Sequence, residues 1–293
     1  MTSSALRTIG ALVDAMARTL GVHGAAAPRE ARELLAALHD MPNHWPSVRR
    51  DVEVSNELWT AGLHAARRRA TGTPVQYVAG RAAFRHLVLD VDERVLIPRP
   101  ETEMLVEIVL DRCGTDAGGI AVDVGTGSGA IALALASEGP FERVLATDVS
   151  LDAVHVARAN AASSAEYLRA DVEVRHGSLL SPITERGVRA VVSNPPYIAF
   201  GEREALPTSV RDWEPAVALY CGDEGLSVTA RLVRDAAVVL APNGVLAIET
   251  DTRRTALVAE LIAANGAYGN VQLLLDLTGR ERFVVARRLE EQG

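Results

Sequence analysis

The segment Asn194-Pro195-Pro196-Tyr197 holds the residues best suited to chemistry, and it follows an apolar run that ends at Val192. The run predicts a buried strand, and Pro195 keeps Asn194 extended as the chain leaves the sheet. Because proline lacks an N–H group, backbone carbonyls here are free to accept hydrogen bonds from a ligand. Asn194 adds a side-chain acceptor and Tyr197 a flat ring. This set suits a planar group with an NH2, such as a carboxamide or the amine of a base, although a strand end followed by a turn has the same pattern.

A glycine-rich turn follows an earlier apolar run at residues 120–124 and is the second feature with chemical potential. Its sequence over residues 125–129 is G-T-G-S-G, and an apolar helical pattern begins directly after it. The glycines permit positive φ angles and a close approach of the backbone to a ligand, while the N–H groups at the start of the helix can bind a carboxylate. The spacing differs from the G-x-G-x-x-G of dinucleotide sites.

Two aspartates extend the glycine-rich turn into a candidate cofactor site. Asp123 stands two residues before the first glycine, where a carboxylate would oppose a pyrophosphate but pair with an α-amino group. Asp148 follows the next predicted strand, 19 residues after Gly129, where an acid accepts hydrogen bonds from ribose hydroxyls. S-adenosylmethionine contains an amino acid, a ribose and a base but no phosphate, so it fits this arrangement of residues. The candidate cofactor-binding residues are Asp123, Gly125, Thr126, Gly127, Ser128, Gly129 and Asp148.

The elements that position these motifs alternate between strand and helix from residue 119 onwards. Short apolar strands between longer helices predict a parallel sheet covered on both faces. The last two strands are separated by a short turn and predict an antiparallel hairpin at a sheet edge. The predicted strands are 120–124, 143–147, 172–175, 189–193, 245–249, 271–277 and 282–287; the predicted helices are 129–137, 151–162, 226–240 and 254–265.

The first third of the chain predicts a different architecture. Short amphipathic helices separated by prolines extend to about Arg69 and predict a helical domain over residues 1–80. We expect this domain to recognise the substrate, although support of the second domain would fit the same pattern. Residues 81–98 alternate in hydropathy on both sides of Asp92 and predict a β-hairpin linker. The catalytic domain would then cover residues 99–293.

Composition excludes several classes of function. All 30 basic residues are arginine, so the chain has no lysine for a Walker-type phosphate loop or a Schiff base. Two cysteines cannot form a disulfide framework and the seven histidines are scattered, so we expect a cytoplasmic protein without a metal. No apolar run approaches the ~20 residues that cross a membrane. Residues 96–293 hold 18 arginines against 28 acids, which argues against direct binding of nucleic acid.

The combination of Asp123–Gly129 with Asn194–Tyr197 resembles methyltransferases that act on planar nitrogens, including DNA adenine N6 enzymes. Three further segments resemble, in the family's order, the HemK/PrmC family of release factor glutamine N5-methyltransferases: TPVQY at 73–77, LIPRPETE at 96–103 and Glu214-Pro215. The resemblance runs from about residue 30 to the end. It implies a Rossmann-like class I S-adenosylmethionine-dependent methyltransferase fold, with a mostly parallel seven-stranded sheet, an antiparallel C-terminal hairpin and a small N-terminal helical bundle.

The resemblance also implies a substrate, the glutamine in the Gly-Gly-Gln motif of class 1 peptide chain release factors. The alternatives are another protein glutamine, such as one on a ribosomal protein, and adenine N6. The implied catalytic residues are Asn194, Pro195 and Tyr197. The implied substrate-binding residues are Asn194, Pro195, Pro196 and Tyr197, to which we add Arg99 and Glu101, although capping of the following helix explains these two equally well. We expect the enzyme to act as a monomer.

The cofactor set gains two residues from the resemblance. Asn194 would lie close to both the cofactor and the glutamine. Where the family often has Asp-Trp, this chain has Ser178-Leu179. Leu179 can still pack against the adenine, whereas Ser178 is a weaker hydrogen-bond acceptor than a carboxylate.

Overall fold

The computed structural model describes residues 7–222 and 225–290, and the chain forms two compact units. The helical unit consists of the residues up to 81 together with 207–213, and the sheet unit of residues 82–206 and those from 214 onwards. The insertion of 207–213 into the helical unit was not expected from the sequence pattern. Residues 1–6 and 291–293 of the predicted domains lie outside the described part of the chain.

The helical unit buries one apolar stripe from each of its longer helices. Thr8 and Ser55 cap the first and the longest of these helices by accepting hydrogen bonds from backbone N–H groups. Gly62 allows close packing, since a side chain there would meet Leu12 and Met16 at 3.1–3.2 Å. The elements are α1 (Ile9–Thr19), η1 (Gly21–Ala26), α2 (Ala27–Leu38), α3 (Trp45–Val48), α4 (Asn56–Ala70), α5 (Val75–Ala79) and α9 (Thr208–Arg211).

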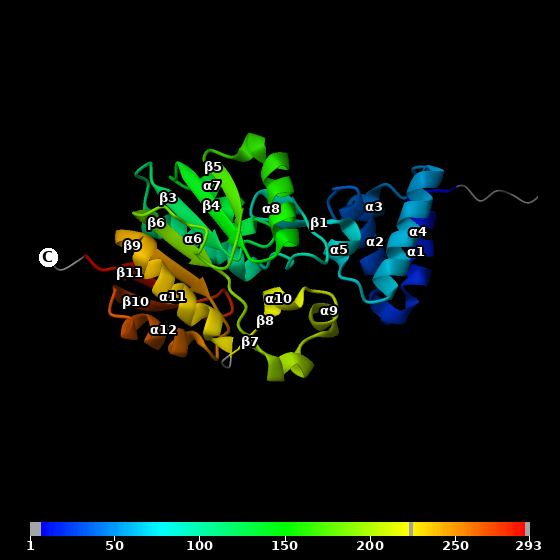
Figure 1. Cartoon of the computed structure of the whole chain (residues 1–293). Helices are drawn as coiled ribbons and strands as arrows, with labels where there is room; N and C mark the ends of the chain where they lie inside the picture. Colours follow the sequence, from blue (N-terminus) through cyan, green and yellow to red (C-terminus); the bar gives the residue numbers. More distant parts are fainter. Residues whose placement is uncertain (1–6, 223–224, 291–293) are drawn as a thin grey trace, which may run out of the picture. The chain divides into compact units, whose positions relative to one another are not determined.

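The sheet unit is built on seven strands in the order β10-β11-β9-β6-β3-β4-β5, with β11 antiparallel to its neighbours (Figure 1). This confirms the predicted mostly parallel sheet with an antiparallel C-terminal hairpin. The strands are β3 (Ile120–Val124), β4 (Arg143–Asp148), β5 (Asp171–His176), β6 (Val188–Ser193), β9 (Leu240–Glu249), β10 (Tyr268–Leu275) and β11 (Glu281–Arg288).

Helices cover both faces of the sheet because most residues of its central strands are apolar, on whichever face they lie. Alternate residues of β3 enter different clusters: Ala121 packs beneath one set of helices and Val122 beneath the other. The first set is α6 (Pro100–Cys113), α7 (Ala130–Glu138) and α8 (Leu151–Ser163), and the second is α11 (Ser227–Val239) and α12 (Thr255–Ala264).

The register of the parallel strands brings the polar motifs to one level. Val124, the last residue of β3, pairs with Thr147 of β4 on one side and Ser193 of β6 on the other. The residues that come directly after these three paired positions therefore lie beside one another at one edge of the sheet. They are Gly125, Asp148 and Asn194, the three positions around which the predicted site was drawn.

The hairpin near residue 90 is shorter than predicted. Its strands are β1 (Arg81–Phe84) and β2 (Leu87–Asp90), so the turn lies at Arg85 and His86 and not at Asp92. Arg85 adopts a positive φ of 54°, as a tight two-residue turn requires. The prediction of a second strand at Val95 and Ile97 was wrong. Both side chains are buried although they lie outside any strand, and their alternation with polar residues resembles that of a strand.

Asn160 fastens this hairpin to the glycine-rich turn, a contact that no motif in the sequence indicated. The side chain is fully buried in α8. Its oxygen accepts from the N–H of Asp90 at 2.8 Å, and its NH2 donates to the carbonyls of Asp90 and Ser128 at 3.0 and 2.8 Å. One buried amide therefore satisfies three backbone groups from two segments.

Replacing Asn160 with alanine should destabilise the protein by about 3 kcal/mol, because three backbone groups lose their hydrogen-bond partner at once. Urea denaturation would measure the change. His155→Ala, at an exposed position of the same helix, is the control and should stay within about 0.5 kcal/mol. An Asn160→Ala variant as stable as its control would contradict this role.

Candidate active site

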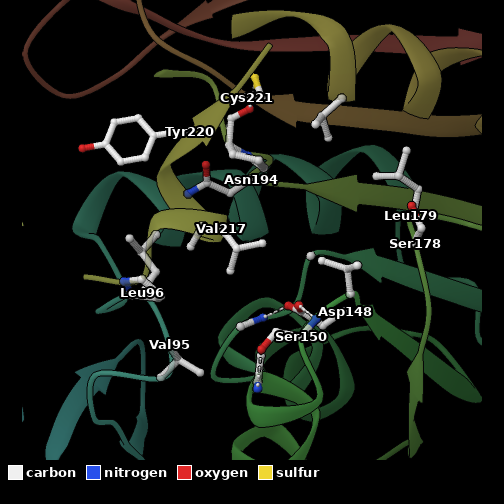
Figure 2. Close-up of a pocket in the computed structure, with 18 of the residues that line it drawn as sticks. Val95, Leu96, Asp148, Ser150, Ser178, Leu179, Asn194, Val217, Tyr220 and Cys221 are labelled. Carbon is white, nitrogen blue, oxygen red and sulfur yellow. Dashed lines mark hydrogen bonds between the residues drawn. The ribbon is translucent and has the colours of Figure 1, made fainter. Parts of the chain in front are cut away.

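A cavity of about 440 Å³ opens where β3, β4 and β6 end. Gly125, Asp148 and Asn194 all line it, so the structure brings together the motifs predicted to work together. Figure 2 shows Asn194 on one side of the cavity and Asp148 with Ser150 on another, with Leu179 on a third. All of the described residues that line it belong to the sheet unit.

The glycine-rich turn is held in shape by backbone hydrogen bonds from the neighbouring strand. The N–H groups of Gly125 and Thr126 both donate to the carbonyl of Thr147, at 2.8 and 2.9 Å. Gly125 and Gly127 have φ angles of 76° and 55°, which residues other than glycine rarely adopt. Gly125 and Gly127 line the cavity, whereas Thr126 and Ser128 are buried beneath it and shape the turn.

Asp148 lines the cavity with both carboxylate oxygens already oriented. One oxygen accepts from the N–H of Ser150 and the other from the N–H of Gly127, each at 2.9 Å (Figure 2). Burial raises the pKa of Asp148, while these backbone N–H groups and His176 lower it. Each oxygen keeps a lone pair for a further donor, such as a ribose hydroxyl.

Asp123 does not line the cavity. It is fully buried at the end of β3, where one oxygen accepts from the Thr126 hydroxyl at 2.6 Å and from the N–H of Ala132 at 3.1 Å. Burial raises its pKa to about 7, and the charge of Asp148 adds to that effect. The second oxygen has no partner within residues 7–222 and 225–290. The carboxylate thus joins the turn to the start of α7.

Asn194 is fixed in one orientation by its neighbours. Its NH2 donates to the Thr102 hydroxyl at 3.2 Å, and that hydroxyl donates to Glu249 at 2.8 Å. The Asn194 side-chain oxygen makes no hydrogen bond to another described residue, so it remains available as an acceptor. Figure 2 shows this amide beside the cavity.

The rest of the Asn194–Tyr197 segment is divided between the cavity and the interior. Pro196 lines the cavity and its carbonyl accepts from the Cys221 thiol at 3.0 Å. Pro195 is buried, and Tyr197 does not belong to the lining of this cavity. Burial raises the pKa of Tyr197 to about 12, and the charge of Glu249 contributes.

Arg99 and Glu101 lie at the start of α6 and do not belong to the lining of this cavity either. Arg99 binds both oxygens of the buried Glu214, at 2.5 and 2.6 Å. Pro215, the next residue, lines the cavity, so this ion pair ties its wall to the helix. The resemblance pointed to Glu214-Pro215 as a motif, but not to this pairing.

The cavity has an apolar wall, of which the motifs in the sequence indicated only Leu179. Leu179 lines it as expected, with a positive φ of 52° that marks local strain. The neighbouring Ser178 accepts from Arg231 at 3.4 Å. The other wall residues come from the 94–96 segment, from α10 (Ala216–Leu219) and β8 (Tyr220–Cys221) and from the start of α11; they include Val95, Leu96, Val217, Ala218, Tyr220 and Val228.

Two further findings bear on the chemistry. In the described part of the chain, no cluster of three or more His, Cys, Asp or Glu side chains is arranged to hold a metal ion. No helix in that part has the length and apolar character of a membrane span.

Comparisons with known proteins show the family and the fold of this chain. The family model described as the PrmC N-terminal domain matches residues 11–80, and that described as the methyltransferase small domain matches residues 100–207. The release factor glutamine methyltransferases of Moorella thermoacetica and Mycolicibacterium smegmatis are each 40% identical to this chain, covering 94% of it and 96% of their own length. A solved methyltransferase from Pyrococcus furiosus shares the fold, with a TM-score of 0.53 at 17% identity over 71% of this chain and 92% of its own. The chain belongs to the release factor glutamine methyltransferase family, with the class I methyltransferase fold that its motifs predicted.

Proposed function

We propose that this protein transfers a methyl group from S-adenosylmethionine to the side-chain amide nitrogen of the glutamine in the Gly-Gly-Gln motif of class 1 peptide chain release factors. The observation that carries the proposal is the Asn194 amide, held with its oxygen free at the edge of the cavity that Asp148 and the glycine-rich turn also line. Membership of the family supports the same substrate.

The residues of the cavity fit S-adenosylmethionine, which supplies an electrophilic methyl group on a cationic sulfur when bound. Asp148 would hold the ribose hydroxyls, residues 125–129 the amino-acid part and Leu179 the base. Burial raises the pKa of both Asp123 and Asp148, and no arginine in the described chain forms an ion pair with either. A bound cation would supply the positive charge that these carboxylates lack.

The protein's contribution to the reaction would be positioning and electrostatics. An amide nitrogen is a weak nucleophile because its lone pair is delocalised into the carbonyl group. The Asn194 oxygen and the Pro195 carbonyl would each accept one N–H of the glutamine. Positive charge grows on the nitrogen as the new bond forms, so these hydrogen bonds strengthen in the transition state. Orientation alone can supply roughly 7–11 kcal/mol in the best cases.

The remaining assignments belong to the same proposal. Tyr197 would hold the plane of the glutamine amide, and the proton would leave to solvent after transfer. Residues 1–80 would recognise the release factor, while Arg99 would act through Glu214 on the cavity wall. We also propose a cytoplasmic monomer that binds no nucleic acid directly; the excess of acids after residue 96 supports the last point.

Mass spectrometry of a release factor incubated with the enzyme and labelled S-adenosylmethionine tests the proposal. We expect one added methyl group on the glutamine of the Gly-Gly-Gln motif. A methyl group found only on a ribosomal protein or on adenine in parallel incubations would replace this substrate with one of the two alternatives.

A further inference from the structure

The orientation of the Asn194 amide depends on two residues that the proposed reaction does not itself use. We propose that Thr102 and Glu249 are positioning residues: they hold Asn194 so that only its oxygen faces the acceptor, and the site thereby selects a glutamine amide over a glutamate carboxylate. Glu249, Thr102 and Asn194 form a chain of two hydrogen bonds, which we call the relay. The inference rests on the proposed function and deepens it.

The fold places the three members of the relay together from distant parts of the chain. Ser193 of β6 pairs with Ile248 of β9, so the next residues, Asn194 after β6 and Glu249 at the end of β9, lie at the same level. Thr102 reaches between them from the first turn of α6. Thr102 and Glu249 are buried, with 5% and 2% of their surfaces exposed, so water does not compete for their hydrogen bonds.

The relay has a direction that follows from its donors and acceptors. An ionised carboxylate only accepts hydrogen bonds, so the Thr102 hydroxyl must donate its single hydrogen to Glu249, at 2.8 Å. The hydroxyl oxygen can then only accept, and the group that faces it at 3.2 Å must be the NH2 of Asn194. The Asn194 oxygen is consequently turned away from Thr102 and towards any bound substrate.

This orientation determines which acceptor the site tolerates. The NH2 of glutamine can donate to the exposed oxygen of Asn194, whereas a glutamate carboxylate would present a lone pair to it. A reversed Asn194 amide would invert the preference, because it would offer NH2 to the substrate. A site built to accept a specific N–H discriminates strongly against a group that lacks it.

The ionisation of Glu249 makes the direction depend on pH. Burial raises the pKa of Glu249 to about 7, against the lowering effects of the Thr102 hydrogen bond and of Arg282 and Arg99, and the charge of Glu101 raises it further. Tyr197 also faces Glu249, but with a pKa of about 12 it stays neutral. Below pH 7 a protonated Glu249 can donate to Thr102, and the direction of the relay is no longer forced. The turnover of the wild type should therefore rise through pH 7 and level off above it.

Thr102→Val tests the relay, because it removes the hydroxyl and keeps the shape of the side chain. We expect kcat to fall by about 10-fold, with an unchanged dissociation constant for S-adenosylmethionine. Thr102→Ser restores a hydroxyl and should recover most of the turnover. Thr250→Val is the matched control: Thr250 is equally buried, lies next to Glu249, and its hydroxyl has no partner among the described residues.

A binding measurement separates positioning from a general loss of activity. Calorimetry without cofactor would compare a release factor with its variant that carries glutamate in the Gly-Gly-Gln motif. The wild type should prefer glutamine by about 10-fold or more, and Thr102→Val should reduce that ratio several-fold. The pKa of Asp123 also lies near 7, so kcat of Glu249→Gln should be measured at saturating cofactor, where cofactor binding does not limit the rate. This variant should no longer show the rise of kcat through pH 7.

The outcomes distinguish the relay from the function on which it rests. A wild type that neither binds nor methylates a release factor would overturn the proposed function and the selection of glutamine with it. An active wild type whose Thr102→Val variant keeps both its kcat and its preference for glutamine would overturn the relay alone. A Glu249→Gln variant that retains the wild-type pH profile would also overturn the relay, even if Thr102→Val does not fold.

Discussion

Replacing Asn194 with alanine should lower kcat by about 100-fold or more, with little change in the affinity for S-adenosylmethionine. The variant loses the acceptor that strengthens its hydrogen bond as charge develops on the glutamine nitrogen. Removal of one preorganised hydrogen-bonding group of this kind typically costs about 10²–10³-fold in rate. It also leaves the Thr102 oxygen without its donor, although that hydroxyl can still bind Glu249.

Single-turnover kinetics at saturating cofactor would measure the effect, since chemistry is then separated from binding and product release. Asn265→Ala is a matched control because it removes the same amide beyond the end of α12, where the side chain accepts a hydrogen bond from the backbone N–H of Ala267. The control should keep the wild-type rate. Wild-type turnover in Asn194→Ala would refute the proposed role of this amide and leave the proposed mechanism without its central group.

Replacing Asp148 with alanine should weaken the binding of S-adenosylmethionine by about 100-fold. Two hydrogen bonds from ribose hydroxyls to a carboxylate contribute about 3 kcal/mol together, and 1.4 kcal/mol corresponds to a factor of ten. The N–H groups of Gly127 and Ser150 also lose their partner, so the glycine-rich turn loses part of its support. The effect should appear in the dissociation constant more than in kcat.

Isothermal titration calorimetry with the cofactor would measure this constant directly. Asp152→Ala is the control, since Asp152 is an exposed acid in the first turn of α8, four residues after Asp148. It should bind the cofactor as the wild type does. A dissociation constant that Asp148→Ala leaves unchanged would remove the ribose assignment, while the proposed role of Asn194 would remain.

The local signals in the sequence were strong wherever a residue type was required by the backbone itself. The positive φ angles of Gly125 and Gly127 and the two prolines after Asn194 restrict the chain regardless of its surroundings. The strand positions followed from continuous apolar runs, because a parallel sheet that is covered on both faces requires apolar residues at most of its positions. The hairpin turn was misplaced because burial of Val95 and Ile97 imitates the alternation of a strand, and burial depends on tertiary packing.

The strands of the seven-stranded sheet, the glycine-rich turn, the Asn194–Tyr197 segment and the family could all be predicted from the order of the residues. The direction in which the Asn194 amide faces could not be predicted in this way, because Thr102 and Glu249 lie 92 and 55 positions away from it along the chain. The same holds for Asn160 and for the Arg99–Glu214 pair. A backbone preference is a property of a few adjacent residues, whereas the partner of a buried polar group is chosen by strand register and helix packing, which no short stretch of sequence contains.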